Sequence, residues 1–166
     1  WIAWEWPDDK AAFGTAIDAS FILDAPAGKH GFAYPKGEDI FFEDGTKARF
    51  WGTNVVMNAN FLEKSEAEKL ADRIARSGFN IVRFHHMDFG TSDNIFTSGT
   101  SMKTTKVLDP GQLDNMFYFM YLLKERGIYY YVDLLVSRQA LESDGIIDAG
   151  DLSQGWKAHS LFDPVL

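Results

Sequence analysis

A helix that leads directly into a buried strand decides the fold, and its sequence over residues 65–84 is SEAEKLADRIARSGFNIVRF. Ser65 followed by Glu68 forms the capping-box pattern that predicts the start of a helix. Apolar residues then recur at helical spacing, and Gly78 predicts a left-handed end to the helix. The following residues, 79–84, are mostly apolar and too few for another helix, which is typical of a buried strand in a parallel sheet.

The same order of signals recurs further along the chain. Asp109 predicts a helix cap, Pro110 suits the first helical position, and Gln112 takes the capping-box place. The stripe predicted to face the sheet consists of Leu113, Met116, Phe117, Met120 and Leu123. Gly127 ends this helix, and residues 128–136 predict the next buried strand. Strands and helices that alternate through short turns predict an α/β fold with a parallel sheet.

Upstream of this repeat, the sequence predicts a β-hairpin that turns at Asp44-Gly45, a strong turn signal. Its second arm is predicted to continue without a break over residues 48–56, as the first of the three parallel strands. We assign residues 1–37 to an N-terminal irregular or β segment. Residues 38–166 form the α/β region.

The N-terminal segment is punctuated by proline and glycine, and a short strand is expected within it at residues 21–23. The chain begins with Trp1 rather than Met, so we expect that an upstream segment was either removed, as a cleaved secretory signal would be, or left out of the sequence. At the other end, Asp163-Pro164 repeats the helix start of Asp109-Pro110. We therefore expect a piece of a larger protein, whose remainder or another chain covers the free edge of the sheet.

Composition excludes several classes of function. The chain is 46% hydrophobic with a net charge of −8, and no cluster of Lys and Arg provides a surface for nucleic acid. No apolar run approaches the roughly 20 residues of a membrane span. The absence of cysteine excludes disulfides, thiol catalysis and thiolate metal sites. We expect neither a nucleic-acid partner nor a membrane partner.

Successive side chains of a strand point to opposite faces, and this alternation indicates which candidate site residues face the interior. In an α/β barrel, one set of alternate side chains faces the helices and the other faces the interior and the active site. Apolar residues suit the helix side, which leaves four polar residues directed inward. These are Asn54, Arg83, His85 and Asp133. They are predicted to converge at the carboxyl ends of the strands, where such folds bind ligands.

Each candidate also has a structural interpretation. Arg83 and Asp133 could form a buried ion pair, although Arg83 would still have donors to spare. His85 and His86 with Asp88 resemble metal ligands, but neighbouring strand residues point to opposite faces, so one ion is poorly served by both histidines.

Two further residues stand outside the strands. His30 is interpreted as a loop residue. Arg138, which follows the third strand, is a further candidate for the active-site face.

Several phrases together resemble one enzyme family. Residues 42–46 leading into 50–54, FWGTN, resemble the barrel entry of cellulase-like glycoside hydrolases of the large retaining clan A. GFNIVR at 78–83 is similar to their second strand, whose terminal Arg lies beside the nucleophilic Glu. RFHHMD at 83–88, with residues 133–138 and 161–164, is similar to a bacterial subgroup related to family 5. This chain departs from the family at the end of the third strand, where the family often carries a His pair and this chain has Leu134-Leu135-Val136.

The resemblance implies the N-terminal portion of a (β/α)₈ barrel, about strands 1–3, in a retaining glycosidase acting on a β-linked saccharide. The acid/base Glu and the nucleophile Glu would follow later strands beyond Leu166, so this chain alone would be inactive. Arg83 would keep the nucleophile ionised, and Asp133 would fix Arg83. The residues expected to contact sugar hydroxyls are Asn54, His85 and His86.

The resemblance implies no cofactor and no metal, and a secreted or periplasmic location. Two alternatives remain open. The first is a non-catalytic carbohydrate-binding or scaffold barrel. The second is a metal-dependent barrel hydrolase that uses His85, His86 and Asp88.

Overall fold

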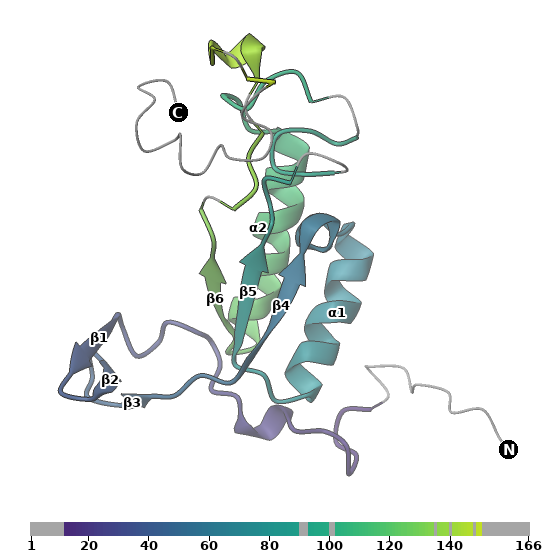
Figure 1. Cartoon of the computed structure of the whole chain (residues 1–166). Coiled ribbons are helices and arrows are strands. Elements are labelled where there is room, and N and C mark those ends of the chain that lie inside the picture. The colour runs from purple at the N-terminus through teal and green to yellow at the C-terminus, as the bar shows by residue number, and fades with distance from the viewer. Residues whose placement is uncertain are drawn as a thin grey trace, which may run out of the picture. The chain divides into compact units, whose positions relative to one another are not determined.

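The computed structural model describes residues 12–89, 93–99, 102–134, 136–139, 141–147 and 149–150. The helix start expected near Asp163 lies outside these residues. Short 3₁₀ helices span Ser20–Ile22, Met57–Asn60 and Glu142–Asp144. The longer elements, in chain order, are β1 (Ala33–Lys36), β2 (Asp39–Phe42), β3 (Lys47–Ala48), β4 (Gly52–Val56), α1 (Lys64–Arg76), β5 (Ile81–His85), α2 (Pro110–Glu125) and β6 (Tyr129–Val132) (Figure 1). No helix in the described part of the chain is long and apolar enough to cross a membrane.

The elements form two sheets, and the fold is α/β. The antiparallel sheet has the order β1-β2-β3, and the second sheet has the order β4-β5-β6 with all three arrows pointing the same way (Figure 1). The predicted order of the three parallel strands is therefore confirmed. Two α-helices separate these strands in the sequence, as the repeated cap and glycine signals indicate.

The chain divides into two compact units. The first unit comprises Trp1–Asn54, Leu62–Arg83 and Phe117–Tyr131. The second comprises Val55–Phe61, Phe84–Met116 and Val132–Leu166. The antiparallel sheet and α1 belong to the first unit. The loops that follow β5 and β6 belong to the second.

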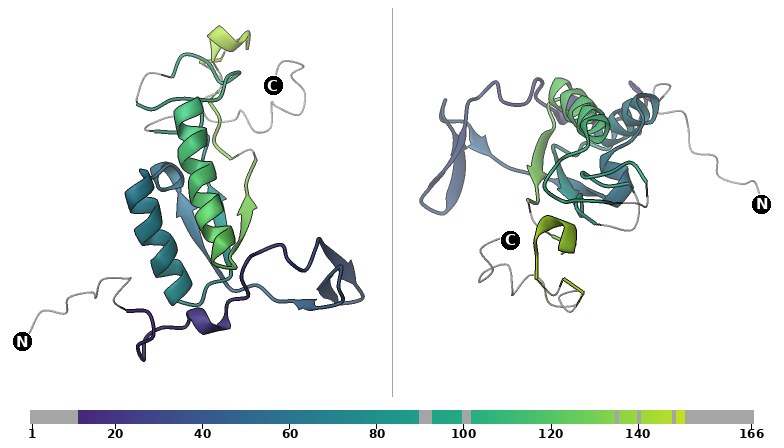
Figure 2. Two further views of the ribbon diagram at one scale, coloured as in Figure 1. Left: turned by 180° about the vertical axis from the view of Figure 1, so that it is seen from behind. Right: turned by 90° about the horizontal axis from the view of Figure 1, so that it is seen from above.

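Within the first unit, α1 and the second half of α2 cover the same face of the parallel sheet (Figure 2). The core of this unit consists of small and aliphatic side chains. Full burial of a large aliphatic side chain stabilises the folded state by about 1.5–3 kcal/mol. Its members include Ala67, Ala71, Ile74, Val82, Leu123 and Ile128. Arg126 joins the two helices because Nη2 and Nε donate to Asp72 Oδ1 at 2.6 and 2.9 Å.

The first predicted helix has the expected end but a different start. Gly78 has φ +75°, and its N–H donates to Ala75 O at 2.9 Å, as a left-handed helix end requires. The predicted N-cap Ser65 is wrong, because α1 begins at Lys64 and the cap position is Glu63 without a side-chain cap bond. Instead, Glu63 O accepts the N–H groups of both Glu66 and Ala67, which starts the helix two residues earlier.

The second predicted helix begins where expected. Asp109 Oδ1 accepts the N–H groups of Gly111 and Gln112 at 2.9 and 3.0 Å, so Asp109 is the cap. The capping-box role of Gln112 is wrong, since its amide donates to Thr97 O and the Asp109 N–H donates to Ile95 O.

The predicted stripe of this helix is right at three positions and wrong at another. Met116, Met120 and Leu123 are buried, whereas Phe117 is 57% exposed. Phe119 is fully buried instead, because it lies three residues after Met116 and four before Leu123, on the same helical face.

The hairpin at Asp44-Gly45 is present, and it pairs Ile40 with Ala48. The predicted continuous arm over 48–56 is wrong, because the chain leaves β3 at Ala48 and enters the other sheet at Gly52. The side chain of Asn80 explains the break. Its Nδ2 donates to Arg49 O and its Oδ1 accepts the Trp51 N–H, both at 2.7 Å, so it takes the place of a partner strand.

Gly52 permits the close approach of β4 to β5. A Cβ atom at this position would lie 2.4 Å from Ile81 Cγ2 and 2.5 Å from Ile81 O. A larger residue would therefore push the two strands apart.

Two other predicted strands differ from the structure. The strand predicted at residues 21–23 is wrong, because Ser20–Ile22 is a 3₁₀ helix whose first N–H donates to Asp18 Oδ1 at 2.8 Å. Residues 33–36, in the segment assigned as irregular or β, form β1. The third parallel strand is shorter than the predicted 128–136, since β6 ends at Val132.

Candidate functional site

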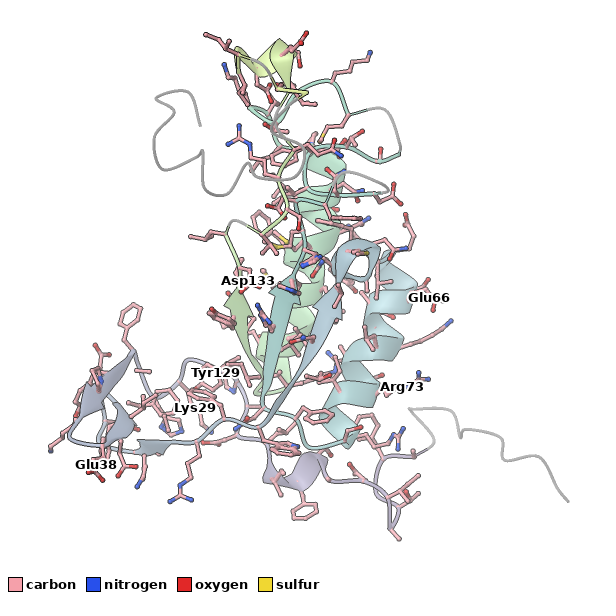
Figure 3. The ribbon with its side chains drawn as sticks, in the orientation of Figure 1. Lys29, Glu38, Glu66, Arg73, Tyr129 and Asp133 are labelled. Carbon is pink, nitrogen blue, oxygen red and sulfur yellow. The ribbon has the colours of Figure 1, made fainter. Side chains whose placement is uncertain are left out.

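Of the predicted site residues, His85 and Asp133 lie at the carboxyl ends of parallel strands, whereas Asn54 and Arg83 lie in the middle of β4 and β5. Asn54 lies in β4, Arg83 and His85 lie in β5, and Asp133 directly follows β6. Figure 3 shows Asp133 at the carboxyl end of β6 and Tyr129 at its amino end. In β5, the alternation is confirmed, because Val82 and Phe84 are fully buried while the intervening side chains are half-buried.

His85 and Asp133 contact each other within the second unit. Nδ1 of the imidazole contacts Oδ2 of the carboxylate. The Asp133 side chain is only 8% exposed, while the His85 side chain is 21% exposed. Among the described residues, no group hydrogen-bonds Nε2 of His85. The carboxylate therefore forms the inner member of the pair, and the imidazole presents the accessible face.

His86 lies against His85 rather than on the opposite face of the strand. Their ring centroids are 4.0 Å apart, and the ring of Phe89 stacks on His86 at 5.9 Å. The expectation of opposite faces is wrong because β5 ends at His85, and His86 has a left-handed φ of +54°. The left-handed backbone at His86 directs its side chain toward that of His85.

A buried amide holds the backbone at this turn. Asn60 is fully buried, and its Nδ2 donates to His85 O at 2.8 Å and to Met57 O at 2.7 Å. The end of β5 is therefore fixed by a hydrogen bond from the 3₁₀ helix that follows β4.

Asp88 organises a loop instead of facing the histidines as a metal ligand. Its carboxylate accepts the backbone N–H groups of Val136, Ser137 and Arg138, each at 2.9 Å, and the residue is 6% exposed. Three donors around one carboxylate define the path of the chain after β6. In the described ranges, no group of three or more His, Asp or Glu residues is arranged to hold a metal ion.

Arg138 and Asp144 fix the same loop further along. Arg138 Nε donates to Thr105 Oγ1 at 2.7 Å, and the Thr105 N–H donates to Asp144 Oδ2 at 2.8 Å. Burial alone would raise the pKa of Asp144, but bonds from the Thr104 and Thr105 hydroxyls, the Thr105 N–H and the charge of Arg138 outweigh burial. The net result is a pKa below the ordinary value. Nothing in the sequence pattern predicted this role for Asp144, because its partners lie about forty residues away.

Arg83 and Asn54 belong to the first unit. The guanidinium carbon of Arg83 lies 5.9 Å from the centroid of the Tyr131 ring, within the range of a cation–π contact. Asn54 is exposed. The ion pair expected between Arg83 and Asp133 stays a prediction, as does the convergence of all these residues on one ligand.

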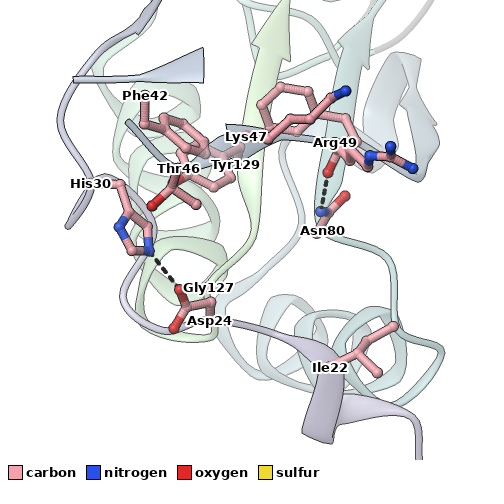
Figure 4. A pocket seen from close by; sticks show the side chains of 11 residues that line it. Ile22, Asp24, His30, Phe42, Thr46, Lys47, Arg49, Asn80, Gly127 and Tyr129 are labelled. Atoms are coloured by element: carbon pink, nitrogen blue, oxygen red, sulfur yellow. Dashed lines mark hydrogen bonds and ion pairs between the residues drawn. The ribbon is translucent and has the colours of Figure 1, made fainter. Parts of the chain in front are cut away.

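A pocket of about 180 Å³ lies in the first unit, at the amino ends of β5 and β6 (Figure 4). His30 lines it, and both ring nitrogens contact carboxylates: Nε2 is 2.6 Å from Asp24 Oδ2 and Nδ1 is 2.5 Å from Asp44 Oδ2. These bonds to Asp24 and Asp44 raise the pKa of His30. The ring also stacks on Phe42, which stacks on Tyr129.

The sequence interpretation of His30 as a loop residue therefore missed its contacts. Gly28 and Gly31 on either side of His30 are turn signals, and they favoured the interpretation as a simple loop. In the structure, the His30 side chain joins the hairpin to the preceding loop.

Comparison with known proteins shows a similar fold but does not assign the chain to a family. No protein-family model matches the chain, and no curated protein matches it. A solved structure of a glycoside hydrolase family 5 protein from Bacteroides vulgatus is similar, with a TM-score of 0.50 and 20% sequence identity. The match covers 66% of this chain and 26% of that chain. This chain thus spans about a quarter of the matched protein's length, and the likeness shows a shared α/β arrangement.

Proposed function

We propose that the chain forms the first strands and helices of a (β/α)₈ barrel that hydrolyses O-glycosidic bonds in a β-linked oligosaccharide or polysaccharide. The alternation β4-α1-β5-α2-β6 supports this proposal, because it is the repeat from which such barrels are built. The fold shared with a family 5 glycoside hydrolase is a second observation that supports this proposal.

The observation that carries the proposal is the contact of His85 with Asp133 at the carboxyl ends of two parallel strands. Active sites of (β/α)₈ enzymes lie at this end of the strands. A partly exposed imidazole supported by a buried carboxylate suits a ligand rich in hydroxyl groups, since each ring nitrogen can donate or accept one hydrogen bond.

In a retaining reaction, one carboxylic acid protonates the leaving oxygen and a second carboxylate, about 5–5.5 Å away, attacks the anomeric carbon. We assign both of these roles to Glu residues on later strands of the whole protein. Arg83 would lie beside the nucleophile and keep it ionised by its charge. Asn54, His85 and His86 would contact sugar hydroxyls. A secreted or periplasmic location would give the enzyme access to polymeric substrates.

The proposal is tested with the full-length protein and a panel of 4-nitrophenyl β-glycosides that differ in the sugar. We expect release of nitrophenol from at least one member, no loss of activity in EDTA, and a product whose anomeric configuration, followed by NMR, matches the substrate. Binding of β-linked oligosaccharides without any hydrolysis would favour the non-catalytic barrel. Activity abolished by EDTA and restored by zinc would favour the metal-dependent hydrolase.

A further inference from the structure

The contact between Asp133 and His85 determines which nitrogen of the imidazole carries a proton. An ionised carboxylate can only accept hydrogen bonds, so Nδ1 of His85 must be the donor in this contact. A neutral imidazole has one N–H, which leaves Nε2 as an acceptor with a lone pair. An imidazole without such a partner prefers the opposite tautomer, with the proton on Nε2.

Both members of the pair are held in place by other bonds. The Asp133 N–H donates to Phe84 O at 3.1 Å, and His85 O accepts a bond from buried Asn60 at 2.8 Å. The ring of His86 lies 4.0 Å from the ring of His85 on one side. The imidazole is thus fixed in position, with 21% of its side chain exposed and the carboxylate almost covered.

We propose that Asp133 is a positioning residue that holds His85 in the Nδ1–H tautomer, so that Nε2 accepts a hydrogen bond from a hydroxyl group of the bound ligand. This inference rests on the proposed function for the identity of the ligand, a saccharide. It assigns Asp133 a role through His85, in addition to the role toward Arg83 predicted from the sequence. The pair selects a ligand group that donates at this position and disfavours an anion or a carbonyl.

The tautomer is measured directly by two-bond ¹H–¹⁵N NMR correlations of the imidazole in the full-length protein, which identify the nitrogen that carries the proton. We expect a protonated Nδ1 and an unprotonated Nε2 for His85. The variant Asp133→Ala removes the acceptor and should move the proton to Nε2. Asp93→Ala is the matched control, because Asp93 is an exposed aspartate of the same unit with no contact to His85 among the described residues.

A second measurement connects the tautomer to the ligand. Turnover of the best 4-nitrophenyl β-glycoside should fall roughly 10- to 100-fold in Asp133→Ala, the effect of losing one hydrogen bond to a polar partner in a site. Asp133→Glu, which retains an acceptor near Nδ1, should recover part of the loss. Asp93→Ala should behave as the unmodified protein.

The outcomes separate the two proposals. A protonated Nε2 on His85 of the unmodified protein overturns the role of Asp133, whatever the activity. The expected tautomer with unchanged turnover in Asp133→Ala also overturns it. Absence of hydrolysis and of saccharide binding in the unmodified protein contradicts the proposed function, while the tautomer result still decides how Asp133 acts on His85.

Discussion

His30 and His85 both contact aspartate, but they differ in how many ring nitrogens are occupied. Both nitrogens of His30 contact carboxylates, those of Asp24 and Asp44, and its ring stacks on Phe42. His85 contacts one carboxylate through Nδ1 and has an accessible ring. The two histidines are similarly exposed, at 21% each, so exposure does not distinguish them.

The difference teaches how to separate a structural histidine from one that is available to a ligand. A ring that donates from both nitrogens is an imidazolium with no acceptor left, and it serves to join two carboxylates. A ring with one nitrogen engaged has a fixed orientation, and its other nitrogen can form a hydrogen bond to a ligand. His30 thus joins the hairpin to the loop before it, and His85 is the one of these two histidines with a ring nitrogen available to a ligand.

The largest effect expected from this comparison is on turnover. We expect His85→Ala in the full-length protein to lower turnover of a β-glycoside roughly 10- to 100-fold, because one hydrogen bond to the substrate is lost. His30→Ala is the matched control and should leave turnover unchanged, since His30 has no free nitrogen. Steady-state kinetics of both variants check this. Equal losses in both variants would show that the two histidines do not differ in function.

The next effect concerns Asp88, a carboxylate that contacts backbone N–H groups instead of an imidazole. Asp88→Ala leaves three buried or partly buried donors without their acceptor, and we expect it to lower the free energy of unfolding by about 2–4 kcal/mol. Urea unfolding monitored by circular dichroism measures this.

Asp93→Ala serves again as the control for this experiment, because it removes an exposed carboxylate from the same unit. Its unfolding midpoint should match that of the unmodified protein. If Asp88→Ala unfolds at the same urea concentration as this control, the loop after β6 does not depend on Asp88.

The sequence predicted much of the fold. Gly78, Gly127 and Asp109 punctuate two helix–strand repeats, and these local signals are enough to predict three parallel strands in order. Alternation within β5 then predicted which side chains face the helices. These features follow from short-range periodicity, which a single sequence displays directly.

The features that the sequence did not predict depend on hydrogen bonds between residues far apart in the chain. Asn80 breaks the strand at Trp51 through its amide, 29 residues away. Asp88 binds a loop 48–50 residues further on. His86 turns back because its backbone is left-handed, a conformation that histidine adopts uncommonly and that no residue pattern signals.

The smallest effect expected is a pH-dependent loss of stability at His30. Its pKa in the folded protein is raised above the ordinary value of 6.5, first by the bond to Asp24 and then by the bond to Asp44. Below pH 6.5, the ring is protonated in both the folded and unfolded chains, so its contribution to stability is complete. As the pH rises above 6.5, the unfolded chain loses the proton first, and the contribution declines until the pH exceeds the folded pKa.

The carboxylates act in the opposite direction at low pH. Hydrogen bonds from Thr46 and His30 lower the pKa of Asp44 to about 2, so its contribution disappears as the pH falls from 3.8 toward that value. We therefore compare melting temperatures of the unmodified protein and His30→Gln at about pH 5, 7 and 9. The difference should be largest at pH 5 and smallest at pH 9, and Lys106→Gln, which removes an exposed cation, should show no such trend. A difference that grows from pH 5 to pH 9 would mean that His30 is bound as the neutral ring, and its contrast with His85 would be lost.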